Sequence, residues 1–138
     1  MSFVLDACAL IAYLRDEPGA AVVEEVLLQN ETPRLVHAVN LCEVYYQFLR
    51  ATDERTAQRA LAELHLTGLL AREDLDRVFW QQVGKYKVQL SSGPRSFALA
   101  DCFALALAHR EHATLVTSDH GEFDQVAEQR ICPVRFIR

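Results

Sequence analysis

Three aspartates occur next to or inside apolar segments, where packing alone does not require a carboxylate and a chemical role would account for one. Asp6 directly follows a short apolar run, and Asp119 closely follows the apolar run at 114–117. Asp101 is the only polar residue in the apolar stretch 97–108. A carboxylate buried in such a stretch must be paired, protonated or bound to a cation, so Asp101 is the strongest single candidate for a functional site.

Each of these acids also has an ordinary structural explanation. Asp6 could cap a following helix, and Asp119 fits a turn with the His-Gly after it. Asp101 could pair with one arginine. Glu43, a fourth candidate, lies on a polar stripe at helical spacing that a solvated helix face would explain. Function is therefore indicated by the four acids together and not by any one of them.

The elements that would position these acids alternate between strands and helices. Short apolar runs predict strands at 2–5, 34–37, 69–71, 114–117 and 134–137. Helical spacing and capping residues predict helices at 7–14, 18–28, 41–52, 53–64, 74–88 and 97–112. We expect Pro18 to open the second helix, Asn40 and Ser96 to cap two others, and residues 91–94 to form a loop. The alternation indicates an α/β fold with a mostly parallel sheet of four to five short strands and helices on both faces.

The order of the elements brings the acids toward one edge of the sheet. Parallel sheets bind ligands beyond the carboxyl ends of their strands, where Asp6 and Asp119 stand. Glu43 and Asp101 lie near the starts of two helices, at the same edge. Carboxylates gathered there repel one another unless a divalent cation neutralises them, and an all-oxygen ligand set favours Mg²⁺ or Mn²⁺ over zinc. Such ions can activate water and stabilise the charge developing on a phosphodiester.

The composition limits the classes of protein to consider. A chain of 138 residues with 51% hydrophobic and 24% charged residues is typical of one globular domain, here 1–138. The net charge of −5 argues against nucleic-acid binding through net charge, although a metal can invert the sign of an acidic site. The four cysteines form no C-x-x-C pair, which argues against structural zinc or disulfides. With no signal peptide or membrane span in the sequence, we expect a cytoplasmic protein.

Basic residues that could hold a polyanion lie just before the Asp101 helix. Lys85, Lys87 and Arg95 occur in a segment without acids and are candidates to bind substrate phosphates, although a solvated basic loop explains them as well. Arg15 and Arg110 are candidates of lower rank. Aromatic residues at helical spacings are expected in the core or at a dimer interface rather than as stacking platforms for bases: Tyr45, Tyr46, Phe48, Phe79 and Trp80.

The segments around the four acids carry a resemblance when they are taken in order. They are Leu5-Asp6-Ala7, Asn40-Leu41-Cys42-Glu43-Val44, Ala100-Asp101-Cys102 and Thr117-Ser118-Asp119-His120. This order resembles the PIN-domain family and, more narrowly, the VapC-type ribonuclease toxins of toxin–antitoxin pairs. The resemblance spans nearly the whole chain and implies a three-layer α/β/α fold and an endoribonuclease that depends on Mg²⁺ or Mn²⁺.

The resemblance also assigns roles to residues of this chain. It implies that Asp6, Glu43, Asp101 and Asp119 form the metal site and act in catalysis, with Asp124 as a further, more variable acid. Thr117 matches the hydroxyl expected before the last acid, and Cys8 stands where relatives often place Ser or Thr. The implied partners are an RNA substrate, a small antitoxin and a second copy of the chain in a homodimer. Because a guanidinium can bridge carboxylates, we expect the antitoxin to insert a basic residue into the acidic cleft.

Two other functions remain open from the sequence. Asp6 after the first strand could be the nucleophile of an aspartyl phosphatase, although that chemistry usually places a second acid two residues on, where this chain has Cys8. The acids could also form a non-enzymatic cleft that only receives a basic partner peptide.

Overall fold

A five-stranded parallel sheet forms the centre of the protein. The computed structural model describes residues 1–92 and 94–138, and Gly93, in the loop expected at 91–94, lies outside them. The strands follow the order β3-β2-β1-β4-β5, and every neighbouring pair is parallel. Their bounds are β1 (Phe3–Leu5), β2 (Arg34–His37), β3 (Leu70–Arg72), β4 (Thr114–Thr117) and β5 (Val134–Phe136). The predicted α/β fold with a parallel sheet of short strands is confirmed.

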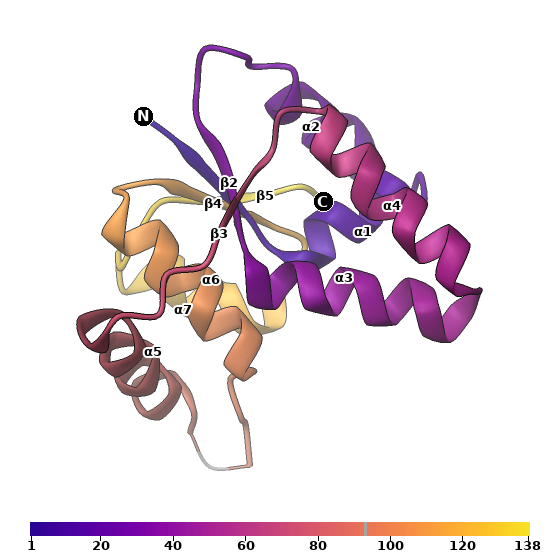
Figure 1. Ribbon diagram of the computed structural model, residues 1–138. Helices are drawn as coiled ribbons and strands as arrows, with labels where there is room; N and C mark the ends of the chain where they lie inside the picture. The colour runs from indigo at the N-terminus through magenta and orange to yellow at the C-terminus, as the bar shows by residue number, and fades with distance from the viewer. Residues whose placement is uncertain (93) are drawn as a thin grey trace.

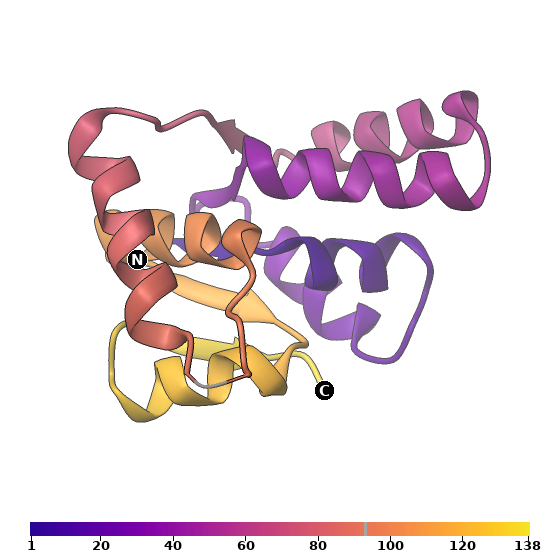
Figure 2. The same ribbon diagram turned by 90° about the horizontal axis from the view of Figure 1, so that it is seen from below.

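Seven helices among the described residues cover this sheet. They are α1 (Ala7–Leu14), α2 (Ala20–Leu27), α3 (Ala38–Ala51), α4 (Glu54–Leu66), α5 (Arg77–Leu90), α6 (Leu99–Arg110) and α7 (His120–Glu128). Figures 1 and 2 show α1 to α4 on one side of the sheet and α5 to α7 on the other. In Figure 2, α3 and α4 run side by side and extend away from the sheet. None of the helices in the described part of the chain is long and apolar enough to cross a membrane.

The strands separate two hydrophobic cores because successive side chains point to opposite faces. Phe3 and Leu5 pack with α1 to α4, whereas Val4 between them packs with α5 to α7. The same alternation divides Val36 from Leu35 on β2. The sheet is therefore covered on both faces, which is why the middle residues of its inner strands β1, β2 and β4 are apolar.

Two predicted helix caps are wrong. α3 begins three residues earlier than expected, because His37 Nδ1, and not Asn40, accepts the hydrogen bond of the Val39 N–H at 3.1 Å. α6 begins after Ala98, because the Ser96 hydroxyl accepts a hydrogen bond from Lys87 Nζ at 2.8 Å instead of capping the helix. At α3 a different local cap replaces the expected one, whereas at α6 a longer-range contact engages the serine hydroxyl.

Other boundaries moved by local backbone geometry. Pro18 does not open α2; the helix follows Gly19, whose φ of +95° is a conformation that glycine adopts easily. α5 starts at Arg77 because the Asp76 carboxylate accepts from the Phe79 N–H at 3.2 Å. α7 was not predicted at all, since Asp119 and the residues after it read as a turn.

Candidate functional site

The site lies where the order of the strands reverses. The chain runs from β1 outward to β2 and β3, then returns to the other side of β1 for β4 and β5. Ligands of open α/β sheets bind at such a point, beyond the carboxyl ends of the strands. Asp6 follows β1 and Asp119 follows its neighbour β4. The fold therefore brings together two acids that are far apart in the sequence.

Asp6 is fixed on every side. Its Oδ1 accepts a hydrogen bond from the Ala9 N–H at 2.9 Å, so it caps α1, and its Oδ2 accepts one from the Thr117 hydroxyl. The side chain is 0% exposed. Burial raises the pKa of Asp6 to about 7, the two hydrogen bonds oppose this rise, and the charges of Asp119 and Glu43 add to it. Asp6 is thus both a helix cap and a member of an acidic cluster.

Thr117 connects the acids of the two neighbouring strands. The same hydroxyl oxygen that donates to Asp6 accepts a hydrogen bond from the Asp119 N–H at 3.0 Å. Asp119 in turn caps α7, with Oδ1 accepting from the Glu122 N–H at 3.1 Å. One threonine therefore sets the position of both carboxyl groups, the supporting place that the sequence suggested for it.

Asp101, Asp119 and Glu122 approach one another most closely. One carboxylate oxygen from each lies within 4.8 Å of the others, the spacing that could hold a single metal ion. Burial, a hydrogen bond with Glu122 and the charges of Glu122, Asp6 and Glu43 hold the pKa of Asp101 far above its usual range. In the absence of a cation, these surroundings therefore favour the protonated form of Asp101.

Glu122 is the acid that the sequence reasoning missed. Both its carboxylate oxygens accept from the Ala98 N–H, at 3.2 and 3.3 Å, so it also ties the start of α6 to α7. A signal was present, because Asp119 and Glu122 have the spacing of a helix cap and its third residue. Recognising α7 would have placed both side chains on the same face of its first turn.

Asp101, Asp119 and Glu122 line one hollow of about 400 Å³, which we name the acidic hollow; Asp6 is not part of its lining. Glu43 reaches it from α3, and burial together with the charge of Glu122 raises its pKa. Cys8 also lines it, and burial followed by the charge of Asp6 raises the pKa of its thiol to about 12, so the thiol stays protonated. The full lining is Cys8, Val39, Cys42, Glu43, Tyr46, Ala98, Ala100, Asp101, Asp119 and Glu122. A larger hollow of about 510 Å³ between α3, α4 and β3 is lined by no carboxylate.

Comparison with known proteins identifies the family. The family model for the PIN domain matches residues 3–129 of the chain. The chain belongs to the PIN-domain family. A search of curated proteins finds no match.

Solved structures share this PIN fold at low sequence identity. The VapBC2 complex of Rickettsia felis, bound to a DNA fragment from its promoter, contains a chain of TM-score 0.77 and 18% identity, covering 99% of this chain and 98% of that one. VapBC-1 of Haemophilus influenzae gives TM-score 0.72 and 17% identity over 99% and 98% of the two chains. VapC20 of Mycobacterium tuberculosis, described as a toxin that cleaves the sarcin–ricin loop, gives 0.71 and 15% over 91% and 95%.

Asp124 lies outside the acidic hollow of this PIN domain. It pairs with His120 Nδ1 at 2.9 Å, and both side chains are about half exposed. The pair raises the pKa of His120, with a further contribution from the Arg138 carbonyl. Asp124 is two residues beyond Glu122 on α7, so the helix turns its side chain away from the cluster. The structure does not bring this fifth predicted acid to the others.

The three basic residues predicted to bind substrate have different surroundings. Lys87 Nζ donates to Ser96 Oγ and to the Phe97 carbonyl, so it fixes the segment before α6. Lys85 is exposed on α5. Arg95 is exposed and lines a separate hollow beside His120. None of the three lines the acidic hollow.

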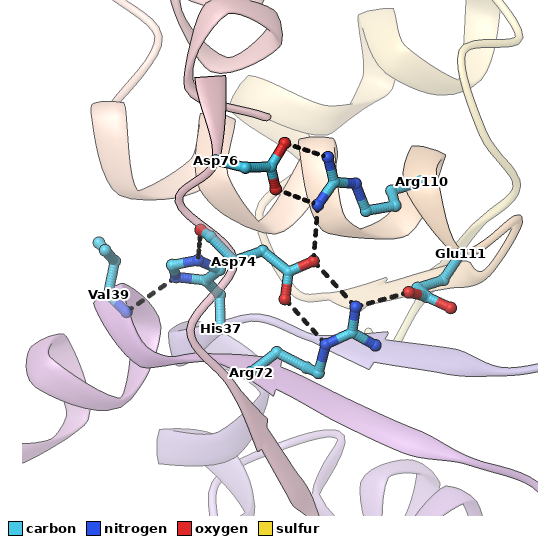
Figure 3. A network of polar contacts seen from close by, with 7 residues as sticks. All are labelled: His37, Val39, Arg72, Asp74, Asp76, Arg110 and Glu111. Atoms are coloured by element: carbon cyan, nitrogen blue, oxygen red, sulfur yellow. Dashed lines mark hydrogen bonds and ion pairs between the residues drawn. The ribbon is translucent and has the colours of Figure 1, made fainter. Parts of the chain in front are cut away.

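Arg110 is already paired within the protein, at the far end of α6 from Asp101. Its guanidinium donates to Asp76 at 2.7 and 2.9 Å and to Asp74 at 3.0 Å (Figure 3). Arg72 binds the other side of Asp74, and Figure 3 shows it also reaching Glu111. This ion-pair network joins β3, α5 and α6 and leaves Arg110 no free role with substrate.

Proposed function

We propose that this PIN-domain protein is a divalent-metal-dependent endoribonuclease, the toxin of a toxin–antitoxin pair. The observation that carries the proposal is the acidic hollow. Glu43, Asp101, Asp119 and Glu122 come from separate parts of the chain and line it together. Asp6 is buried close enough to Asp119 and Glu43 for their charges to raise its pKa further. An enclosed group of acids without basic partners is costly to a protein, and phosphodiester hydrolysis is a reaction that uses one.

The donor set fits Mg²⁺ or Mn²⁺. Asp101, Asp119 and Glu122 would hold the ion directly, with Asp6 and Glu43 adjacent to it. All these donors are carboxylate oxygens, the ligands that hard cations prefer. The raised pKa values of Asp6, Glu43 and Asp101 support the same conclusion, because burial and the charges of neighbouring acids both disfavour the ionised carboxylates, which a cation would stabilise. When bound, such an ion supplies an activated water and neutralises charge on the phosphodiester.

The protein's own residues orient the carboxylates and accept the proton of the attacking water. Thr117 and the Ala9 N–H hold both oxygens of Asp6, so this carboxylate keeps one orientation. Asp119 is held by its cap to α7. Glu43 is half-buried, with a raised pKa, which suits it to accept a proton from an attacking water.

The related structures and the negative charge of the acidic hollow both support the partners that we propose for this protein. The Rickettsia felis and Haemophilus influenzae structures are toxin–antitoxin assemblies, which supports an antitoxin for this chain. An arginine or lysine of that antitoxin would replace the cation among the carboxylates. A homodimer and a cytoplasmic location complete the proposal. VapC20 is a toxin that cleaves the sarcin–ricin loop, which supports RNA as the substrate class.

Burial argues against the aspartyl-phosphatase alternative. A nucleophile must reach the phosphorus atom, whereas Asp6 is 0% exposed and both its oxygens already accept hydrogen bonds.

The test is RNA cleavage by the purified protein with matched variants. We expect cleavage in Mn²⁺ or Mg²⁺, none in EDTA, and recovery when the metal is restored. Asp101→Asn should lose activity by about 100-fold or more while remaining folded. Asp124→Asn, which removes an acid outside the hollow, should keep activity. Robust cleavage by folded Asp101→Asn contradicts the assignment, and the absence of both metal binding and cleavage favours the non-enzymatic binding module.

A further inference from the structure

Tyr46 is an exposed aromatic side chain on the wall of the acidic hollow. It is 46% exposed and lines the hollow together with Glu43, Asp101, Asp119 and Glu122. The sequence placed Tyr46 in the core or at a dimer interface, as it did Phe48, which is 8% exposed. Tyr46 instead turns to the side of α3 that carries Glu43, because the two residues are three positions apart on the helix.

Arg50 extends this surface away from the acids. Its guanidinium carbon lies 6.0 Å from the centroid of the Tyr46 ring, and its Nη2 donates to the Gln47 side-chain oxygen. Tyr46 and Gln47 follow Glu43 by three and four residues, and Arg50 follows them by four and three, so all four residues share one face of α3. Arg50 therefore stands about 10 Å along the helix from Glu43.

This pairing matches the chemistry of single-stranded RNA. Proteins bind unpaired nucleotides by stacking bases on aromatic rings and placing arginine or lysine on the phosphates between them. A hollow lined by carboxylates repels a polyanion, so the residues beside it must supply attraction. Lys87, one of the residues expected to do so, donates instead to Ser96 and Phe97.

We propose that Tyr46 and Arg50 form a nucleotide subsite next to the scissile bond. Tyr46 stacks on an unpaired base, and Arg50, held by Gln47, binds the phosphate on the side of that nucleotide away from the acidic hollow. This inference rests on the proposed ribonuclease function and names how its substrate is held. It assigns substrate recognition to α3, apart from the basic segment before α6.

The subsite can be tested by RNA binding without cleavage. A short fluorescein-labelled single-stranded RNA of mixed sequence is titrated with Asp101→Asn protein in Mn²⁺, and anisotropy reports affinity. Tyr46→Leu keeps an apolar side chain without a ring face and should weaken binding about 5- to 150-fold. Tyr46→Phe should remain within about twofold, since stacking does not need the hydroxyl. Trp80→Ala is the matched control, because Trp80 is 48% exposed on α5, outside the hollow, and should bind as the parent does.

Two further measurements identify the groups that bind. A series of RNAs, each lacking the base at a different single position, is titrated with the parent and with Tyr46→Leu. Loss of the base at one position should weaken binding to the parent. Tyr46→Leu should bind that RNA no more weakly than the parent does. Arg50→Ala should weaken binding and lower the dependence of log Kd on log salt by about 0.7.

The outcomes separate this subsite from the ribonuclease proposal. Unchanged RNA affinity in folded Tyr46→Leu overturns the subsite, even where the same variant binds a partner protein less well. A loss equal to that of Trp80→Ala also overturns it. Cleavage of the same RNA by the parent protein is measured separately, so the ribonuclease stands where the subsite fails. RNA held through Tyr46 but never cleaved supports the subsite and contradicts the ribonuclease.

Discussion

Asp101 is the side chain whose chemistry the fold changes most. It interrupts an apolar helix, and burial together with Glu122, Asp6 and Glu43 holds its pKa far above the usual range. In the unfolded chain the same carboxyl group ionises near its ordinary pKa of 3.8. The metal-free protein is therefore destabilised by this group at neutral pH. The cost is absent below about pH 3.8 and grows as the pH rises toward the pKa of the folded state.

Asp101→Asn should accordingly stabilise the metal-free protein. The amide is nearly isosteric and can still donate to Glu122. Because it does not ionise in the unfolded chain, it removes the ionisation that favours unfolding of the parent at neutral pH. We expect the free energy of unfolding in EDTA at pH 7 to rise by about 1 kcal/mol. Mn²⁺ should stabilise the parent more than the variant, because the variant's site has lost a charge. Thermal melts with and without Mn²⁺ measure both effects, and a variant melting well below the parent in EDTA would show that Asp101 holds a structural ion pair instead.

The site residues differ in how visible they are in the sequence. Asp101 could be found because a lone acid in an apolar helix has few structural explanations. Glu122 is harder to find, because it stands among other polar residues of α7 and its spacing from the Asp119 cap does not show that it approaches Asp101. Tyr46 was misplaced for a related reason: an aromatic residue at helical spacing reads as core until the neighbouring elements leave its face uncovered.

The elements around the site are held by polar contacts that no local pattern encodes. His37 ends β2 and caps α3 through Nδ1, and its Nε2 donates to the Asp74 carbonyl at 2.9 Å (Figure 3). The two hydrogen bonds orient the His37 ring, which stacks on Phe79 of α5 with ring centroids 5.3 Å apart. The start of the helix that carries Glu43 is thereby tied to the segment between β3 and α5.

The network of Arg72, Arg110, Asp74 and Asp76 should make stability depend on pH in the acid range. The hydrogen bond from Arg72 lowers the pKa of Asp74, and the one from Arg110 lowers the pKa of Asp76 to about 2. Carboxylates with depressed pKa values stabilise the fold above their unfolded value of 3.8, and this stabilisation is lost as the pH falls toward 2. Arg110→Met should therefore destabilise the protein at pH 7, and the difference from the parent should shrink between about pH 4 and pH 2.

Denaturant unfolding at a series of pH values measures that difference. Arg55→Met, which removes an exposed arginine from α4, serves as the control and should show no such acid dependence. An Arg110→Met effect that is constant from pH 7 to pH 2 would mean that the arginine acts through packing, for example on the Phe79 ring 5.0 Å from its guanidinium carbon.

Arg34, the first residue of β2, connects the C-terminal ends of two helices. It is 6% exposed, and its Nη1 donates to the carbonyls of Leu27 and Thr67, which lie at the C-terminal ends of α2 and α4. A cation there satisfies carbonyls that the helices leave free and interacts well with both helix dipoles.

Arg34→Met should therefore cost about 2 kcal/mol of unfolding free energy, since it removes hydrogen bonds to a charged group. Denaturant unfolding at neutral pH gives the value, and the exposed Arg55→Met again provides the reference. A loss no larger than that of Arg55→Met would show that water replaces the guanidinium without cost.

At the scale of the whole molecule, the alternation of elements was predictable and their arrangement was not. Apolar runs of about four residues between helical segments are enough to indicate a parallel α/β sheet, because such strands are buried on both faces. Neither the order β3-β2-β1-β4-β5 nor the placement of α7 follows from local patterns. The strand order and the position of α7 both depend on which buried faces pack together. As a result, Asp119 and Glu122 lie near Asp101, whereas Asp124 lies near His120.

The central claim is that these separated acids form one divalent-cation site, and calorimetric titration of Mn²⁺ tests it most directly. Glu122→Gln and Asp124→Asn each remove one charge from α7, three and five residues after Asp119. The account predicts that Glu122→Gln weakens Mn²⁺ binding by about tenfold or more, whereas Asp124→Asn binds as the parent does. Equal affinity in the parent and Glu122→Gln, or a loss confined to Asp124→Asn, would contradict it.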